Sequence, residues 1–241
     1  MLFSVNYFPP LISGFLLTAG FPNPDLGYAA FFALVPFLVA LDPMDAKQAF
    51  KSGLVMGLCH YTTLIYWIIP TLSTYGGLHF LLSASALILL GLYLSLFPAV
   101  FAFAMKKLDP PQAFSPILGS LIWVGLEFAR THLFTGFPWG VMGYTQYDNL
   151  ILVQTADLAG VLGLSFLILL GNYLLAGLWI RFSKAKTLSR NRKRQLLVCL
   201  AYIPAIFALA FSYGNARIET IDQRIDKAPR TGIAIVQGNI K

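Results

Sequence analysis

The sequence predicts an all-α polytopic membrane protein. Hydrophobic residues make up 57% of the 241 residues and charged residues only 11%, whereas a soluble domain carries about 25% charged residues. The mean hydropathy is +0.71, and the apolar residues form seven runs separated by short polar segments. Because so few charges cannot cover a water-facing surface, we expect about seven transmembrane helices. Residues 1–213 would form the membrane domain and residues 214–241 a polar tail.

The first two apolar runs, 11–21 and 28–41, are short, and the sequence PNPD separates them. Proline cannot continue a helix, so we expect a tight helical hairpin here. The third run, 52–70, contains Gly53 and Gly57, which are four residues apart. This spacing allows close contact with another membrane helix.

The remaining apolar runs are long enough to cross a hydrocarbon core of about 30 Å as helices. They cover residues 78–105, 115–134, 157–180 and 196–213. With seven crossings, the two ends of the chain lie on opposite sides of the membrane.

The distribution of Lys and Arg predicts the orientation of these helices. Eleven of the 17 basic residues lie in loops that fall on one side, whereas the loops 22–27, 71–77 and 131–156 on the other side carry none. Positive loops stay in the cytoplasm, so we expect a cytoplasmic N-terminus and a periplasmic C-terminus. The net charge of +7 is therefore topological, and it does not indicate a nucleic-acid partner.

Two charged residues are expected within the hydrocarbon. Glu127 lies 11 residues after Pro116, roughly 16 Å along a helix, and an unpaired carboxylate at that depth costs about 3 kcal/mol. Arg130 follows at a spacing that places both side chains on one face. One interpretation is a structural ion pair. The other is that Arg130 binds a lipid phosphate while Glu127 orients it.

The segment 134–149, FTGFPWGVMGYTQYDN, is the most informative stretch of the chain. Glycine and proline residues favour an irregular backbone, and aromatic residues favour the boundary of a membrane. The glycines and proline are Gly136, Pro138, Gly140 and Gly143, and the aromatic residues are Phe137, Trp139 and Tyr144. Irregular backbone at membrane depth occurs where it lines a cavity or is buried in protein. The segment therefore predicts a loop that lines a lipid-facing cavity, with residues 147–149 at its rim.

No pattern for metal binding or for a known cofactor is present. His60, His79 and His132 are far apart in the sequence, and His60 is expected to be a hydrogen-bonded packing residue. Cys59 and Cys199 lie within apolar runs and are expected to be small buried hydrophobic residues. We therefore predict no metal and no cofactor in this chain.

The tail ends in GIAIVQGNIK, and residues 232–236 have the pattern of a buried strand. A single strand is not stable alone, so we expect this one to belong to a further domain.

The residues 134–149, the preceding Glu127 and Arg130, the hairpin ending in 21–25 and the terminal VQGNI resemble, in this order, the apolipoprotein N-acyltransferase family. The resemblance covers essentially the whole chain. It implies an enzyme of the bacterial inner membrane with a periplasmic nitrilase-like α/β domain. Such an enzyme moves an acyl chain from a phospholipid to the lipidated N-terminal cysteine of a lipoprotein, through a thioester on a catalytic Cys aided by Glu and Lys.

The resemblance also implies that VQGNI is the first strand of the nitrilase-like domain, and that the catalytic residues lie beyond this chain. The chain would then be the lipid-binding half, and a separately encoded nitrilase-like half is one candidate partner. The candidate residues for contact with phospholipid and lipoprotein chains are Glu127, Arg130, Phe137, Pro138, Trp139 and Tyr144. The alternative interpretation is a multi-pass transporter for small molecules.

Overall fold

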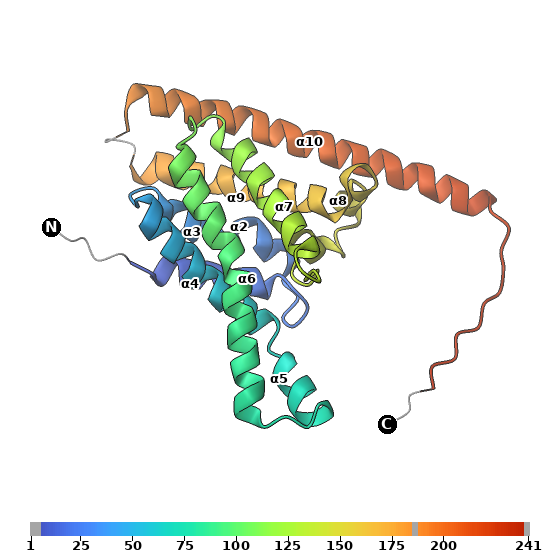
Figure 1. Cartoon of the computed structure of the whole chain (residues 1–241). Coiled ribbons are helices and arrows are strands. Elements are labelled where there is room, and N and C mark those ends of the chain that lie inside the picture. The colour runs from blue at the N-terminus through green and yellow to red at the C-terminus, as the bar shows by residue number, and fades with distance from the viewer. Residues whose placement is uncertain (1–5, 185–187, 239–241) are drawn as a thin grey trace.

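The computed structural model describes residues 6–184 and 188–238, and every regular element within these ranges is helical. The elements are α1 (Phe8–Ala19), η1 (Gly27–Ala29), α2 (Ala30–Ala33), α3 (Val35–Leu41), α4 (Ala46–Leu64), α5 (Ile68–Pro70), the π-helix η2 (Thr71–Tyr75), α6 (Phe80–Leu108), α7 (Ser115–His132), η3 (Met142–Gln146), α8 (Leu150–Val153), α9 (Ala156–Ser183) and α10 (Arg190–Lys227). Figure 1 shows them as one bundle from which α5 and the first half of α6 project.

Three helices of the described residues, α6, α9 and α10, are long and apolar enough to cross a membrane. Helix α4 and the segment 68–75 meet the same criteria together, with a bend of 56° between them, which gives up to four crossings. Helix α1 and the segment 27–41 are apolar but shorter. The helical membrane architecture expected from the composition is therefore confirmed.

Helices α4 and α6 run side by side (Figure 1) and pack closely at two glycines. A Cβ atom added to Gly57 would lie 2.6 Å from Cγ of Pro98, and one added to Gly53 would lie 2.5 Å from Cα of Ala99. Any larger side chain at these positions would push the two helices apart. The predicted role of Gly53 and Gly57 in close helix contact is confirmed.

A side-chain amide is inserted into the hydrogen bonding between α2 and α3. In a continuous helix the backbone N–H of Leu34 would donate to the carbonyl of Ala30. Instead, Asn172 of α9 accepts from the Leu34 N–H through Oδ1 and donates to the Ala30 carbonyl through Nδ2, both at 2.7 Å. The Ser13 hydroxyl oxygen accepts from the N–H of Phe37 at 3.0 Å. Such an insertion breaks a helix, so α9 holds the break in the first hairpin.

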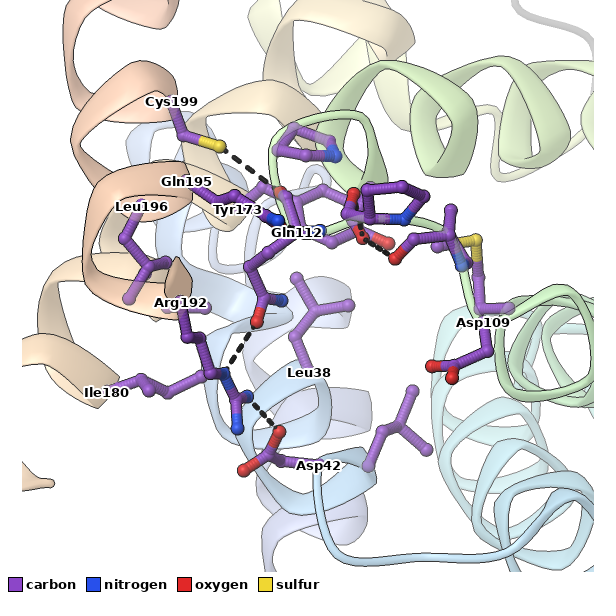
Figure 2. A pocket seen from close by; sticks show the side chains of 18 of the residues that line it. Leu38, Asp42, Asp109, Gln112, Tyr173, Ile180, Arg192, Gln195, Leu196 and Cys199 are labelled. Carbon is purple, nitrogen blue, oxygen red and sulfur yellow. Dashed lines mark hydrogen bonds and ion pairs between the residues drawn. The ribbon is translucent and has the colours of Figure 1, made fainter. Parts of the chain in front are cut away.

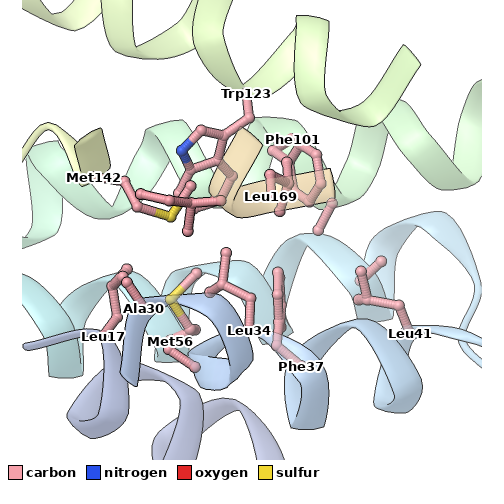
Figure 3. Packing of buried hydrophobic residues seen from close by; sticks show 14 of the residues in the cluster. Leu17, Ala30, Leu34, Phe37, Leu41, Met56, Phe101, Trp123, Met142 and Leu169 are labelled. Carbon is pink, nitrogen blue, oxygen red and sulfur yellow. The ribbon is translucent and has the colours of Figure 1, made fainter. Parts of the chain in front are cut away.

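The largest hydrophobic core joins the hairpin to the loop that follows α7 (Figure 3). The rings of Phe101 and Trp123 meet edge to face with centroids 5.1 Å apart. Met142, the first residue of η3, is only 1% exposed and lies in the same cluster. The core therefore anchors the C-terminal end of the 134–142 segment.

Helix α10 continues past residue 213, the predicted domain boundary, to Lys227. The strand predicted at 232–236 is not formed. These residues have no regular structure, and Ile233, Ile235 and Val236 are each more than 80% exposed. The physical reason is that a strand requires a partner for its backbone groups, and the described residues offer none.

Candidate functional site

The segment between α7 and η3 has an irregular backbone. Phe134, Gly136 and Gly140 have φ angles of 57°, 78° and 76°, in the left-handed region. Glycine adopts this region without steric cost, which explains two of the three glycines singled out in the sequence. Phe134 is 91% exposed, so its ring is held out from the bundle by a conformation that non-glycine residues rarely adopt.

Arg130 lies beneath this loop and binds its backbone carbonyls. Its side chain is 1% exposed. Nη1 donates to the carbonyl of Phe137 at 3.1 Å and to that of Trp139, and Nη2 donates to the carbonyl of Gly140 at 3.2 Å. The guanidinium also lies 5.5 Å from the centre of the Tyr61 ring. A planar group with several fixed N–H donors is suited to bind diverging carbonyls in this way.

Glu127 and Ser165 bind the amides that follow. Oε1 of Glu127 accepts from the N–H of Met142 at 2.8 Å, and Oγ of Ser165 accepts from the N–H of Gly143 at 2.8 Å. These amides open η3 and would otherwise lack partners. Oε2 of Glu127 is buried and has no hydrogen-bond partner in the described part of the chain.

A direct Glu127–Arg130 ion pair, one of the two interpretations of the sequence, is not formed among the described residues. Both side chains bind the loop backbone instead, the cation its carbonyls and the carboxylate an amide. The buried carbonyls and amides of the loop must be paired, which explains why both side chains bind the loop and not each other. Arg130 and Glu127 therefore both stabilise the loop, each through its own hydrogen bonds to the loop backbone.

The aromatic residues of the loop form a partly exposed surface. Trp139 is 55% exposed and Tyr144 53% exposed, while Phe137 is half-buried. The Trp139 ring lies 5.1 Å from that of Phe137 and 5.7 Å from that of Trp67, which precedes α5. Pro138 is exposed between them. Four of the six candidate residues therefore present apolar or aromatic surface, and the other two fix the backbone beneath it.

A groove of about 310 Å³ lies between the loop and α6. Its lining is mostly apolar, with two hydroxyl-bearing side chains, and consists of Leu90, Tyr93, Leu133, Phe134, Thr135, Gly136 and Phe137. The ring of Phe134 lies 6.0 Å from that of Tyr93 across it. A groove of this size and composition matches the mostly apolar lining of small-molecule sites.

The rim of the loop is fastened to the first hairpin. Tyr147 donates from its hydroxyl to Oδ2 of Asp25 at 2.5 Å, and Gln146 donates from Nε2 to the carbonyl of Gly27 at 2.7 Å. The hydrogen bond to Asp25 raises the pKa of Tyr147 to about 12, because it stabilises the protonated hydroxyl. The two segments lie far apart in the sequence, and nothing in their composition predicts this contact.

Three residues outside the segment support the site. Ser165 and Tyr61 contact the loop or Arg130, and His60 packs between Phe21 and Tyr61 while its Nδ1 lies 2.9 Å from Oγ1 of Thr18. The packing role predicted for His60 is thus confirmed. Ser165 lies in an apolar run where a serine carries no distinguishing pattern.

Within the described residues, no group of three or more His, Cys, Asp or Glu side chains is placed to hold a metal ion. Cys59 and Cys199 are buried and free, as expected for small packing residues.

Replacing Glu127 should separate its two possible contributions. Glu127→Gln keeps an oxygen acceptor for the Met142 N–H and should change stability little. Glu127→Leu leaves that N–H unpaired and should lower the free energy of unfolding by about 1–3 kcal/mol. Denaturant titration in detergent measures both, and Glu219→Leu on the exposed part of α10 is the control. Equal losses in the two Glu127 variants would show that the charge itself is required.

The helices and this site define a helical membrane protein with a buttressed aromatic loop beside an apolar groove. Comparison with known proteins is more specific, because residues 13–174 match the apolipoprotein N-acyltransferase N-terminal domain. The chain belongs to this family, as the resemblance of residues 134–149 indicated.

Curated relatives align along nearly the whole chain. An apolipoprotein N-acyltransferase of Geobacter metallireducens is 37% identical over 98% of this chain and 43% of its own length. That of Neisseria meningitidis serogroup B is 33% identical over 97% of the chain and 44% of its length. Apolipoprotein N-acyltransferase 1 of Treponema denticola is 27% identical over 99% and 42%. The chain thus spans less than half the length of these relatives.

Proposed function

We propose that this chain is the lipid-binding membrane half of an apolipoprotein N-acyltransferase. The loop 134–149 and its groove hold the acyl chains of a phospholipid donor and of a lipidated lipoprotein acceptor. A nitrilase-like domain, in the same polypeptide or in a separate one, carries out the acyl transfer with its own Cys, Glu and Lys. The tail 214–241 leads toward that domain.

One observation above all supports this proposal. The loop backbone is fixed from below by Arg130, Glu127 and Ser165, so that its apolar upper surface is free to contact a ligand. Preorganised loops lose little conformational entropy on binding. The groove against α6 has the apolar lining that an acyl chain requires. The family assignment favours this function over the transporter alternative.

Photo-cross-linking tests the lipid site. A phospholipid with a photoreactive group in its acyl chain should label residues 133–149 and the facing part of α6 above other exposed apolar segments. Trp139→Ala should lower this labelling several-fold, because it removes the ring that packs on Phe137 and Trp67. The control is Trp179→Ala, which changes a similarly exposed tryptophan near the C-terminal end of α9. Even labelling of all apolar surfaces would contradict the proposal.

We further propose about seven membrane crossings, with the N-terminus in the cytoplasm and residues 134–149 in the periplasm. The short apolar helices α1 and 27–41, together with α7, supply the crossings beyond the longer helices. A topology reporter fused after residue 110 should be cytoplasmic, and one fused after residue 240 should be exported. Both fusions in the same compartment would exclude this arrangement.

A further inference from the structure

A small cavity lies where α4, α6 and α7 meet, beside the two charged residues that hold the loop 134–149. Its volume is about 10 Å³, roughly the room that one water molecule occupies. Trp123, Glu127 and Arg130 line it from α7, and their spacing of four and three residues places them on one face of that helix. The other lining residues are Tyr61 of α4, Phe97 and Pro98 of α6, and Leu126 of α7.

Two buried polar atoms of these lining residues have no hydrogen-bond partner in the described part of the chain. One is the indole nitrogen Nε1 of Trp123, which can only donate, and the other is Oε2 of Glu127. Trp123 is 7% exposed and Glu127 is 5% exposed. Unpaired polar groups at such burial are costly, and a charged one most of all. A ligand that accepts from the indole N–H and donates to the carboxyl oxygen would remove both penalties.

Arg130 brings further donors to the same cavity. A guanidinium has five N–H groups, and three of them bind the carbonyls of Phe137, Trp139 and Gly140. Two N–H groups are not used by these bonds. Glu127 and Arg130 line one cavity but form no direct ion pair within residues 6–184 and 188–238. A small molecule between them can therefore connect the two charges.

The walls of this cavity cannot close on it. A Cβ atom added to Gly57 of α4 would lie 2.6 Å from Cγ of Pro98, so α4 and α6 are already in contact there. The ring of Trp123 packs edge to face on Phe101, with centroids 5.1 Å apart. Because neither contact can shorten in a close-packed interior, the cavity is a built feature of the fold.

The size and the charges of the lining select the ligand. A volume of about 10 Å³ is too small for an organic group. A metal cation would face the guanidinium of Arg130 and the N–H of Trp123, whereas an anion would face the carboxylate of Glu127. Water is neutral, fits this volume, and both donates and accepts hydrogen bonds.

The larger cavity shown in Figure 2, of about 500 Å³, differs in this respect. Asp42 there pairs with Lys184 at 2.9 Å and with Arg192, and Arg192 also donates from Nε to Oε1 of Gln112 at 2.7 Å. These charged groups satisfy one another. At the small cavity, by contrast, the buried donor and the buried acceptor each lack a protein partner among the described residues.

We propose that the small cavity binds one structural water molecule, which accepts from the Nε1–H of Trp123 and donates to Oε2 of Glu127. An unused N–H of Arg130 donates to the same water, so that the two charges interact through it. Three hydrogen bonds are typical of a buried water. The water completes the support beneath the loop 134–149, and it does not depend on the proposed function.

NMR spectroscopy of the full chain in detergent, with isotope-labelled tryptophan indoles, tests the proposal. The chain has four tryptophans, so the indole spectrum is simple and single Trp→Phe variants assign it. The indole N–H of Trp123 should show NOE and ROE cross-peaks to water of opposite sign, which distinguishes a bound water from proton exchange. Trp179, which is 61% exposed, is the control and should show no such pair of cross-peaks.

Two variants identify the acceptor. Glu127→Gln keeps a side-chain oxygen and should retain the Trp123 cross-peaks to water, whereas Glu127→Leu removes the acceptor and should lose them. The indole signal of Trp179 should be unchanged in both variants, so that lost water is not lost folding.

The unmodified chain decides first, without any variant. A Trp123 N–H that lacks the water cross-peaks would overturn the proposal and would assign Nε1 a direct bond to Glu127. Cross-peaks that persist in a folded Glu127→Leu variant would overturn it as well, because the carboxylate would then not hold the water.

Discussion

Arg130→Met should lower the free energy of unfolding by about 3–5 kcal/mol, because it removes several buried hydrogen bonds from a charged donor at once. The methionine fills a similar volume but has no N–H donor. The carbonyls of Phe137, Trp139 and Gly140 then lose their partner inside the bundle. We also expect faster proteolysis between residues 133 and 143, because the left-handed backbone there is held by these bonds. Denaturant titration and limited proteolysis measure the two effects.

Two further variants sharpen this test. Arg130→Lys keeps the charge but lacks the planar fork that reaches several carbonyls, so it should be intermediate. Arg224→Met on the exposed end of α10 is the matched control and should be near wild type. If Arg130→Met folds normally and loses only phospholipid labelling, then Arg130 contacts the lipid itself, the second interpretation of its position in the sequence.

Asn172→Leu should lower the free energy of unfolding by about 2–4 kcal/mol, because two buried backbone groups lose their partner at once. The groups are the N–H of Leu34 and the carbonyl of Ala30, on either side of the break between α2 and α3. Thermal unfolding in detergent measures the loss. Leu175→Ala, a change on the outer face of the same helix, is the control and should cost less.

A near-native unfolding midpoint for Asn172→Leu would show that Leu34 and Ala30 can bond directly once the amide is gone. The break in the first hairpin would then be a property of α9 and not of the hairpin sequence. A cysteine pair placed across the break would report the straightened helix as a changed cross-linking distance.

The sequence predicted the parts of this molecule that depend on local chemistry. Composition indicated a helical membrane protein, the spacing of Gly53 and Gly57 indicated close helix contact, and residues 134–149 indicated an irregular aromatic loop. Each of these signals lies in neighbouring residues or in a simple period.

What the sequence could not predict depends on which distant groups compete for the same partner. Arg130 and Glu127 have the right spacing for an ion pair, but they form hydrogen bonds with the loop carbonyls and amides instead. Ser165 and Asn172 sit in apolar runs, and only the fold shows that they face unpaired backbone groups. Residues 232–236 have a strand pattern but form no strand here, because the described residues offer no partner, and their assignment to a further domain stays a prediction.

The length of helix α10 sets how far the C-terminal tail begins from the bundle. Its 38 residues extend about 57 Å, nearly twice the thickness of the hydrocarbon core. Near the point where it leaves α8, Gly214 packs on the backbone of Ile151, and Arg217 pairs with Asp157 at 2.9 Å. The last turns of α10 are therefore held at their base and extend past the rest of the bundle (Figure 1). From Arg217 to Lys227 the helix rises roughly 15 Å. Deleting whole turns from the end of α10 would bring the start of the tail closer to the bundle by about 5.4 Å per turn.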